Sequence, residues 1–222
     1  MAVQANTKTD PKQISINGGK MGKRPVLKCD FLQGAVNHRL RFGGGRGQHL
    51  PKAVGMKGGQ SPTIIDATAG LGRDAFLLAS LGSKVTLIER SDIIHELLAA
   101  GMNAARQAGG QHKIIIDRMT LIHGDSIALL PHMHADVVLV DPMHPSRQKS
   151  ALVKAEMRAI RDVVGVDEDQ QLLVETALTM ATKRVVLKWP AKAAPLAGLR
   201  PASHQIIGKS IRYDVFMTSK EG

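Results

Sequence analysis

Residues 63–74 read TIIDATAGLGRD, and this stretch decides the fold. Its first residues are mostly β-branched and apolar, which is typical of a buried strand. Small residues and two glycines follow, and residues 74–81 then have the pattern of an amphipathic helix. The stretch therefore predicts a strand, a tight turn and a helix, with backbone amides at the turn that can approach a ligand.

The same alternation of strand and helix continues along the chain. Short apolar runs predict strands at 63–67, 84–89, 119–123, 136–140, 184–188, 205–208 and 212–217. Amphipathic segments predict helices at 74–81, 93–107, 126–130, 151–164 and 169–181. Alternating strands and helices form a doubly wound, mostly parallel sheet, whereas the few residues between the last two runs allow only an antiparallel strand. The sequence thus predicts an α/β fold with the Rossmann-like sheet of class I methyltransferases.

Ligands of such a sheet bind beyond the carboxyl ends of its strands, so the residues that follow each run are candidates for a binding site. Glu89 ends the second run, where a carboxylate can accept hydrogen bonds from a ribose diol. Asp125 follows the third run, at the place where an adenine amino group is commonly bound. The predicted cofactor-binding residues are Gly70, Gly72, Arg73, Asp74, Glu89, Arg90, Asp125, Ser126 and Asp141.

Two other interpretations of these residues stay open. The residues from Gly70 to Ala75 also fit the G-x-G-x-x-G/A fingerprint of dinucleotide-binding proteins, and Glu89 lies close to the expected acidic position. The glycines can equally serve only a tight turn, with Asp66 and Glu89 capping neighbouring helices. An NAD-dependent oxidoreductase is therefore an alternative to a methyltransferase.

The fourth run ends in DPMHP, residues 141–145, which favours the methyltransferase. This pentapeptide resembles the D/N-P-P-aromatic motif of enzymes that methylate exocyclic amines with S-adenosylmethionine (SAM). Prolines fix the backbone, so that the Asp141 carboxylate and the Pro142 carbonyl can accept the hydrogens of one amine. Two such acceptors favour the pyramidal amine as the methyl group approaches, which is catalysis by positioning. We expect Asp141, Pro142 and His144 to be catalytic, with His144 replacing the aromatic ring that usually stacks on the base.

The net charge of the 222-residue chain is +11, and most of it belongs to the first 60 residues. That segment holds eleven Lys and Arg against two Asp, a balance of +9. Such an excess fits a polyanion held through its phosphates, although a solvated basic tail is the other interpretation. Composition predicts a flexible basic leader at 1–25, a basic N-terminal extension with a glycine-rich loop at 26–60, and a SAM-dependent methyltransferase domain at 61–222.

Composition also limits the cellular setting and the metal chemistry. Cys29 is the only cysteine, which excludes an internal disulfide and a cysteine-rich metal site. The polar N-terminus has no secretory signal, and no apolar run approaches the roughly 20 residues of a membrane span. His132 and His134 have no third ligand at a suitable spacing. We expect a cytoplasmic protein that binds no metal and no membrane.

Several longer stretches carry a family resemblance. They read DATAGLGRDAFLLASLG, LIER, DPMHPSRQKSALVKAEMR, ATKRVVLKWP and GKSIRYDVF, with DFLQGAVNHRLRFGGGRGQHLPKAVGMKG upstream. Together they resemble the RsmJ family of guanine-N2 methyltransferases of small-subunit ribosomal RNA, over residues 26–219. The resemblance implies SAM as cofactor, 16S rRNA or the small ribosomal subunit as substrate, and the cofactor-binding residues named above from Arg73 to Asp141. The chain departs from the family at His144, where Tyr or Phe is usual, and at Asp125, where relatives can have small uncharged residues.

Basic residues in two segments are candidates for RNA binding. Arg41 and Arg46 flank a glycine cluster that can approach phosphate or can be a plain hinge, and the helix predicted at 151–164 has one basic face. The predicted RNA-binding residues are Arg39, Arg41, Arg46, Lys52, Arg147, Lys149, Lys154 and Arg158. A non-catalytic RNA-binding protein with the same fold is the third interpretation of the chain.

Overall fold

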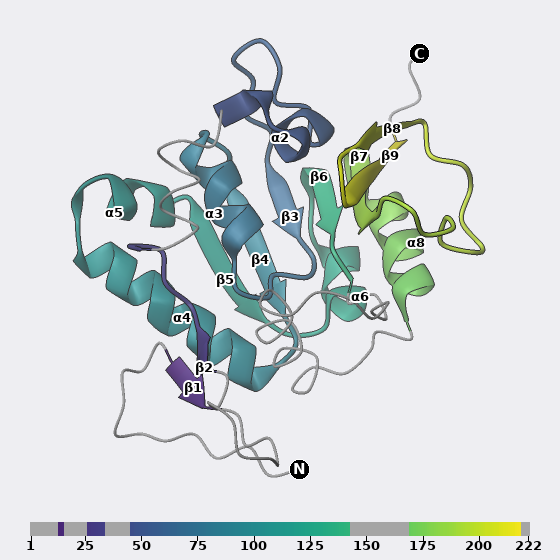
Figure 1. Ribbon diagram of the computed structural model, residues 1–222. Coiled ribbons are helices and arrows are strands. Elements are labelled where there is room, and N and C mark those ends of the chain that lie inside the picture. Colours follow the sequence, from purple (N-terminus) through teal and green to yellow (C-terminus); the bar gives the residue numbers. More distant parts are fainter. Residues whose placement is uncertain (1–12, 16–25, 34–44, 143–168, 219–222) are drawn as a thin grey trace.

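The computed structural model describes residues 13–15, 26–33, 45–142 and 169–218. Seven strands form one sheet in the order β5-β4-β3-β6-β7-β9-β8, with helices on both faces (Figure 1). These strands are β3 (Ile64–Asp66), β4 (Val85–Glu89), β5 (Met119–His123), β6 (Ala135–Val140), β7 (Ala181–Pro190), β8 (His204–Ile207) and β9 (Ile211–Met217). The five neighbouring strands β5, β4, β3, β6 and β7 pair in parallel, and β9 is antiparallel to β7 and to β8. The predicted class I methyltransferase sheet with an antiparallel last strand is confirmed.

The described helices connect these strands. They are α2 (His49–Ala53), α3 (Arg73–Ser80), α4 (Asp92–Gln107), α5 (Gly110–Ile116), α6 (Ser126–Leu129) and α8 (Gln170–Met180), with the 3-10 turns η1 (Gly45–Gly47) and η2 (Leu130–His132). The sequence did not predict α2 and α5. Both helices are short and bury few residues, such as Leu50 and Ile115, so they show no clear helical pattern of apolar positions. The helix predicted at 151–164 lies outside the described residues.

The sheet is buried on both faces, and β6 shows how its sequence achieves this. Val137 and Leu139 point to the face that carries α3, α4 and α5, where they join the larger hydrophobic core. Val138 and Val140 point to the opposite face and pack in the core beneath α8. Successive side chains of a strand point to opposite faces of the sheet. A central strand that is covered on both faces therefore needs a continuous apolar run.

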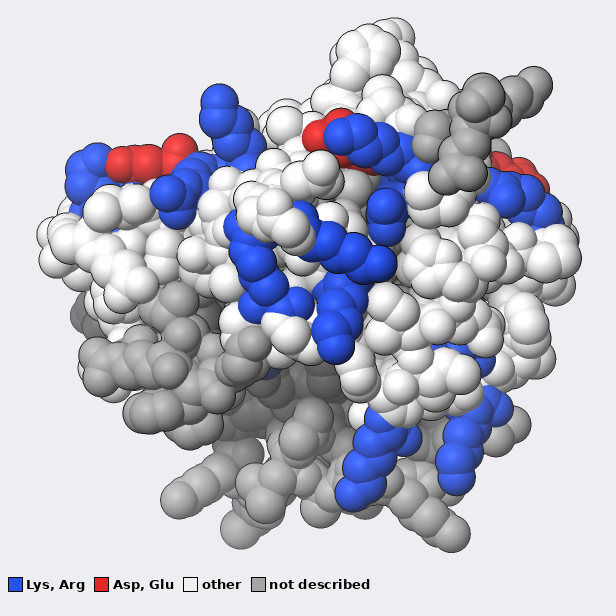
Figure 2. Space-filling view, turned by 90° about the horizontal axis from the view of Figure 1, so that it is seen from above, with Lys and Arg blue, Asp and Glu red and all other residues white. Residues whose placement is uncertain are grey.

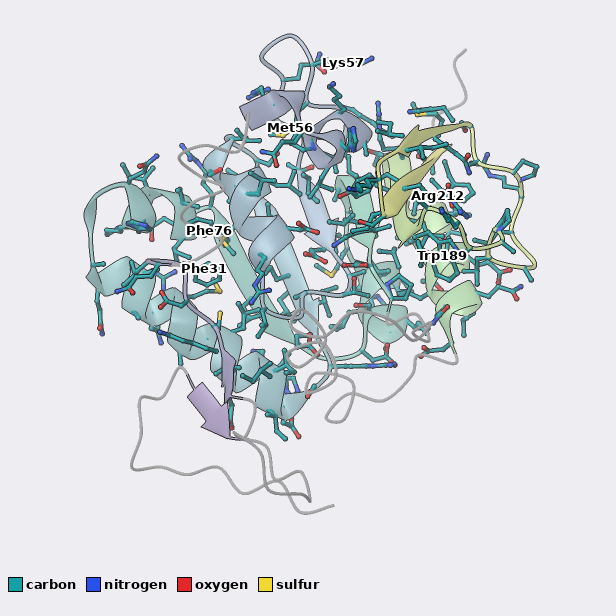
Figure 3. The ribbon with its side chains drawn as sticks, viewed as in Figure 1. Phe31, Met56, Lys57, Phe76, Trp189 and Arg212 are labelled. Atoms are coloured by element: carbon teal, nitrogen blue, oxygen red, sulfur yellow. The ribbon has the colours of Figure 1, made fainter. Side chains whose placement is uncertain are left out.

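The N-terminal segment packs on the domain as well. Strand β1 (Gln13–Ser15) pairs antiparallel with β2 (Val26–Lys28), so three residues of the expected flexible leader form a strand. Leu27, Cys29 and Phe31 are buried in the larger core. The Phe31 ring stacks on Phe76 of α3 with 4.8 Å between the ring centroids, and Figure 3 shows the two rings side by side. The N-terminal extension thus supplies core residues to the domain, while the division into leader, extension and catalytic domain stays a prediction.

Candidate active site

Three carboxylates and one lysine meet where the parallel strands end. Asp66 is the last residue of β3, Asp141 directly follows β6, and Asp74 lies in the first turn of α3. Lys188 of β7 places its Nζ atom 2.7 Å from Oδ2 of Asp74 and 2.7 Å from Oδ2 of Asp141. The register brings them together, because Asp66 is paired with Leu139 of β6, two residues before Asp141. This arrangement is a polar site at the carboxyl edge, where ligands of such sheets bind.

Asp66 and Asp141 hold protons more tightly than ordinary carboxylates do. Burial, together with the charges of Asp74 and Asp141, raises the pKa of Asp66 to about 7. Burial also raises the pKa of Asp141, although the Lys188 ammonium opposes this shift. Lys188 is itself partly buried, but the two carboxylates raise its pKa and keep it charged. With three acids around one cation, the site has an excess of negative charge and suits a cationic ligand.

The two glycines of the predicted turn have different roles. Both have positive φ, +52° at Gly70 and +67° at Gly72. A Cβ atom at Gly72 would lie 2.8 Å from Leu98 and 3.3 Å from Phe31, so this glycine allows α3 to pack closely against the core. A Cβ at Gly70 would meet only the Thr68 carbonyl, at 3.9 Å, because the residue borders open space. Gly70 is therefore the glycine placed to contact a ligand.

Glu89 at the end of β4 braces this turn. Its Oε2 atom accepts a hydrogen bond from the Gly70 amide, and its Oε1 atom accepts one from the Ser91 amide, both at 2.9 Å. Burial raises the pKa of Glu89, while these amides oppose the shift. Each carboxylate oxygen has a second lone pair, so the side chain can still accept two hydrogen bonds from a ribose diol. The geometry thus shows the structural role of Glu89 and leaves acceptors for the ribose contact, which stays a prediction.

Asp125 and Ser126 lie at the end of the third parallel strand, as predicted. Asp125 is exposed and caps α6 by accepting a hydrogen bond from the Ile127 amide at 2.9 Å. The buried Ser126 hydroxyl donates to the Ala67 carbonyl at 2.6 Å. Ser126 therefore ties α6 to the end of β3, a structural role that the prediction of cofactor binding did not include.

The backbone at Asp141 is fixed from the glycine turn. The Asp141 amide donates a hydrogen bond to Oγ1 of Thr68 at 2.7 Å, and Pro142 is buried. This contact joins the ends of β3 and β6, so the carboxylate of Asp141 has a defined place. His144 lies outside the described residues, as do the predicted RNA-binding residues Arg39, Arg41, Arg147, Lys149, Lys154 and Arg158.

The arginines predicted to bind cofactor or RNA have different surroundings. Arg73 is exposed at the start of α3, and Arg90 forms an ion pair with Asp169 at 3.1 Å. Arg46 donates hydrogen bonds to Ser61 Oγ and to the Leu81 carbonyl, both at 2.9 Å. Its guanidinium thus ties η1 to two loops of the protein, and the RNA contact of Arg46 stays a prediction. Lys52 is exposed on α2, as an RNA-binding residue requires.

The connection after β7 is fixed beside the carboxylate cluster. Nη1 of the buried Arg212 donates to the Pro190 and Ala193 carbonyls at 3.0 and 2.6 Å. The Trp189 indole donates to the Ala194 carbonyl at 2.8 Å. Figure 3 shows Trp189 and Arg212 together at this side of the sheet. These bonds preorganise a backbone segment next to Lys188, which the apolar pattern of the sequence did not reveal.

The charges and hydrogen-bonding groups of this site fit SAM. SAM carries a sulfonium and an ammonium group, which the acidic cluster can stabilise, while Gly70 and Glu89 present an open turn and ribose acceptors. The pyrophosphate of NAD is anionic and would meet the same carboxylates at the edge of the sheet. The site electrostatics therefore do not support the dinucleotide interpretation.

Neither a metal cluster nor a membrane-spanning helix is found in the described part of the chain. Among these residues, no group of three or more His, Cys, Asp and Glu side chains is placed to hold a metal ion. Their helices are all too short or too polar to cross a membrane.

Comparisons with known proteins agree with this geometry. A sequence profile of a family of SAM-dependent methyltransferases matches residues 3–218. Ribosomal RNA small subunit methyltransferase J (RsmJ) of Brucella anthropi is 60% identical over 194 residues, which cover 87% of this chain and 95% of that protein. The protein of the same name from Shewanella amazonensis is 49% identical, covering 88% of this chain and 79% of the relative. The chain belongs to the RsmJ family.

A solved structure shows the same fold. The SAM-dependent methyltransferase NGO1261 from Neisseria gonorrhoeae superposes with a TM-score of 0.71 at 32% sequence identity, covering 93% of this chain and 80% of NGO1261. SAM is thus the cofactor of this RsmJ-family chain, as predicted. The family profile begins at residue 3, so it also includes most of the N-terminal segment that the sequence motifs had left outside the resemblance.

Lys188 is a residue of this site that the sequence analysis did not name. It lies within the run from Val185 to Trp189, which is otherwise apolar and buried. A lysine inside a buried strand is unusual, because its charge needs a partner there. This exception to the apolar pattern was the signal that could have identified Lys188.

Proposed function

We propose that this protein transfers the methyl group of SAM to the exocyclic N2 amine of a guanine in 16S rRNA of the small ribosomal subunit, in the cytoplasm. The observation that carries the proposal is Asp141, held at the carboxyl edge beside a site suited to the SAM cation. The names of the Brucella and Shewanella relatives supply the substrate class. The resemblance to the RsmJ family supplies the choice of the guanine N2 amine.

The proposed chemistry needs accurate placement of a weak nucleophile. The lone pair of an amine on a base ring is delocalised, and accepting its hydrogens at two fixed points favours the pyramidal form. The Asp141 carboxylate and the Pro142 carbonyl are these acceptors in the proposal. The amine nitrogen then bonds to the methyl carbon as the carbon–sulfur bond breaks, and the positively charged product amine releases a proton readily. Preorganised acceptors lower the barrier because they need no rearrangement during the reaction.

Other residues support this step by holding the acceptor and the cofactor. Lys188 keeps the Asp141 carboxylate in position and opposes its protonation. We assign Gly70 and Glu89 to the ribose side of SAM, Asp125 to its adenine, and Asp74 to the acidic surroundings of its charged groups. Lys52, with the basic residues predicted outside the described part of the chain, is assigned to RNA.

The proposal is tested by methyl transfer to small ribosomal subunits that lack the modification. The purified protein is incubated with SAM labelled in its methyl group, and the 16S rRNA is digested to nucleosides and analysed by mass spectrometry. We expect one labelled product, N2-methylguanosine. Label in another nucleoside would refute the choice of the N2 amine, and an absence of label in rRNA would refute the proposed substrate. Subunits that already carry the modification are the control and should accept no label.

A further inference from the structure

A cavity of about 390 Å³ lies outside the candidate active site, between helix α2 and the turn that joins β8 to β9. Its walls come from two segments far apart in the sequence, 47–50 and 208–211, and Tyr213 of β9 completes it. Its volume is within the range of pockets that bind small ligands. None of the carboxylates of the active site lines this cavity, so it requires an explanation of its own.

The cavity is close to the reacting site because of the sheet register. Tyr213 of β9 is paired with Lys188 of β7, the residue that contacts Asp141. Directly paired residues of antiparallel strands point to the same face of a sheet, and adjacent strands are separated by about 4.8 Å. A polymer with one unit at Asp141 can therefore place a neighbouring unit in the cavity.

The segments that form the cavity carry positive charge without nearby acids in sequence. Residues 45–65 contain Arg46, Lys52 and Lys57, and residues 176–213 likewise contain Lys and Arg but no Asp or Glu. The first acid after the cavity, Asp214, is buried and pairs with Arg212 at 2.9 Å. Figure 2 shows Lys and Arg side chains gathered on the face seen from above, where Figure 1 places α2. Such a surface attracts a polyanion.

The side chains of the cavity suit a nucleotide. Lys209 is exposed and can pair with a phosphate, and the neighbouring Ser210 hydroxyl can donate a hydrogen bond. His49 supplies an exposed aromatic ring, a common contact of unstacked RNA bases, and the buried Tyr213 forms part of the cavity wall. The His49 ring lies against Gly208, where a Cβ atom would be only 2.9 Å from Nδ1. The absence of a side chain at Gly208 thus leaves room for the imidazole.

We infer that this cavity is a second RNA subsite, which binds a nucleotide close to the target guanine. Lys209 contacts the phosphate of that nucleotide, and His49 contacts its base. The inference rests on the proposed rRNA substrate and extends it, because it assigns RNA binding to the turn between β8 and β9. This turn was absent from the RNA-binding residues predicted by the sequence.

The first experiment compares Lys209→Gln and His49→Ala with a matched control, Lys84→Gln. Lys84 is an exposed lysine next to the amino-terminal end of β4, away from the cavity. We expect His49→Ala to raise KM for unmodified small subunits about fivefold or more, with a smaller change in kcat. Lys209→Gln should weaken RNA binding and lower its salt-dependence slope by about 1. The control should match the wild type, and thermal unfolding should show that all three variants are folded.

A second experiment keeps the subsite separate from the proposed reaction. A single-stranded RNA that carries 4-thiouridine is crosslinked to the wild-type protein by light, and the modified peptides are identified by mass spectrometry. We expect crosslinks within residues 203–213 or 47–52. If the wild type transfers no methyl group to subunits, the proposed function fails, yet the crosslinks still test the subsite. The inference would be overturned if Lys209→Gln and His49→Ala had the same kinetic and binding constants as Lys84→Gln and no crosslink were found in these peptides.

Discussion

The Nζ atom of Lys188 lies 2.7 Å from Oδ2 of Asp141, and the same ammonium contacts Asp74 at 2.7 Å. Strands β6 and β7 carry a second pair of this kind near their opposite ends, where Lys183 lies 3.0 Å from Asp136. The second pair is more exposed at its lysine, 56% against 18% at Lys188. Only the Lys188 pair lies at the ligand edge. The Lys183–Asp136 pair therefore provides an internal control for the role of Lys188.

Replacing Lys188 with Met should reduce methyl transfer more than cofactor binding. Removal of the ammonium takes away a cation that contacts both Asp141 and Asp74, so the pKa of Asp141 rises further. We expect kcat at pH 7 to fall about tenfold or more. The acidic limb of the pH–rate profile should move to higher pH, because Asp141 then ionises at higher pH. The affinity for SAM, measured by calorimetry, should be kept, because the site loses a positive charge that repels this cation.

Lys183→Met is the control for that measurement. It removes a lysine from the same strand and breaks the exposed pair with Asp136, which should cost about 1 kcal/mol of stability or less. Its pH–rate profile should coincide with that of the wild type. Equal shifts in the two variants would show that Lys188 acts through general stability and has no particular link to Asp141.

Asp66 should make the stability of the protein depend on pH near neutrality. Its pKa is raised from 3.8 to about 7 in the folded state, so the folded protein binds this proton more tightly than the unfolded chain does. The stability that the bound proton of Asp66 contributes is fully present below pH 3.8 and is lost as pH rises through about 7. Asp66→Asn removes this titration. As pH rises from 5 to 8, the wild type loses this stability and the variant does not. The free energy of unfolding of the variant should therefore rise by about 2 kcal/mol relative to that of the wild type over this range. Urea unfolding at a series of pH values measures the difference, and a constant difference would contradict the shifted pKa.

Glu89→Ala should weaken SAM binding and also loosen the glycine turn. The change removes the acceptor of the Gly70 and Ser91 amides together with the proposed ribose acceptor. We expect a loss of about 1–3 kcal/mol in SAM binding measured by calorimetry. Glu89→Gln should lose less, because its amide oxygen can still accept. Glu96→Ala, an exposed glutamate on α4, is the control. An unchanged dissociation constant in Glu89→Ala would place this residue outside the cofactor site.

The sequence predicted the parts of the fold that depend on local pattern. Strand β5 was predicted with its observed bounds, Met119–His123, and β4 differed by one residue, because buried strands need apolar runs that end at polar residues. The different roles of the two glycines could not be predicted in the same way. Gly70 borders open space and Gly72 packs on Leu98, a difference that depends on how α4 lies against the turn.

The missing parts of the candidate site depend on pairing between distant strands. Lys188 becomes a site residue only because β7 lies beside β6, and the cavity near Tyr213 forms only because α2 packs near β9. The contacts of Arg46 depend on distant segments in the same way. A basic residue in a glycine-rich loop suggested phosphate binding, which stays a prediction, but the sequence did not show that its guanidinium also donates to Ser61 and Leu81. Charge and composition cannot reveal which cations already have partners within the protein.

Asp141 gives the decisive test of the proposed chemistry. Asp141→Ala removes an acceptor needed mainly as the guanine amine becomes pyramidal, so single-turnover methyl transfer at saturating SAM should fall about 10²-fold or more. Asp141→Asn keeps an amide oxygen at a similar place and should retain more activity than Ala. Because the Asp141 backbone is held by Thr68, either change should leave the turn in place. Asp136→Asn on the same strand is the control and should transfer methyl groups at the wild-type rate once folded. Wild-type rates in both Asp141 variants would show that this residue only ends a strand, and the proposed mechanism would then be wrong.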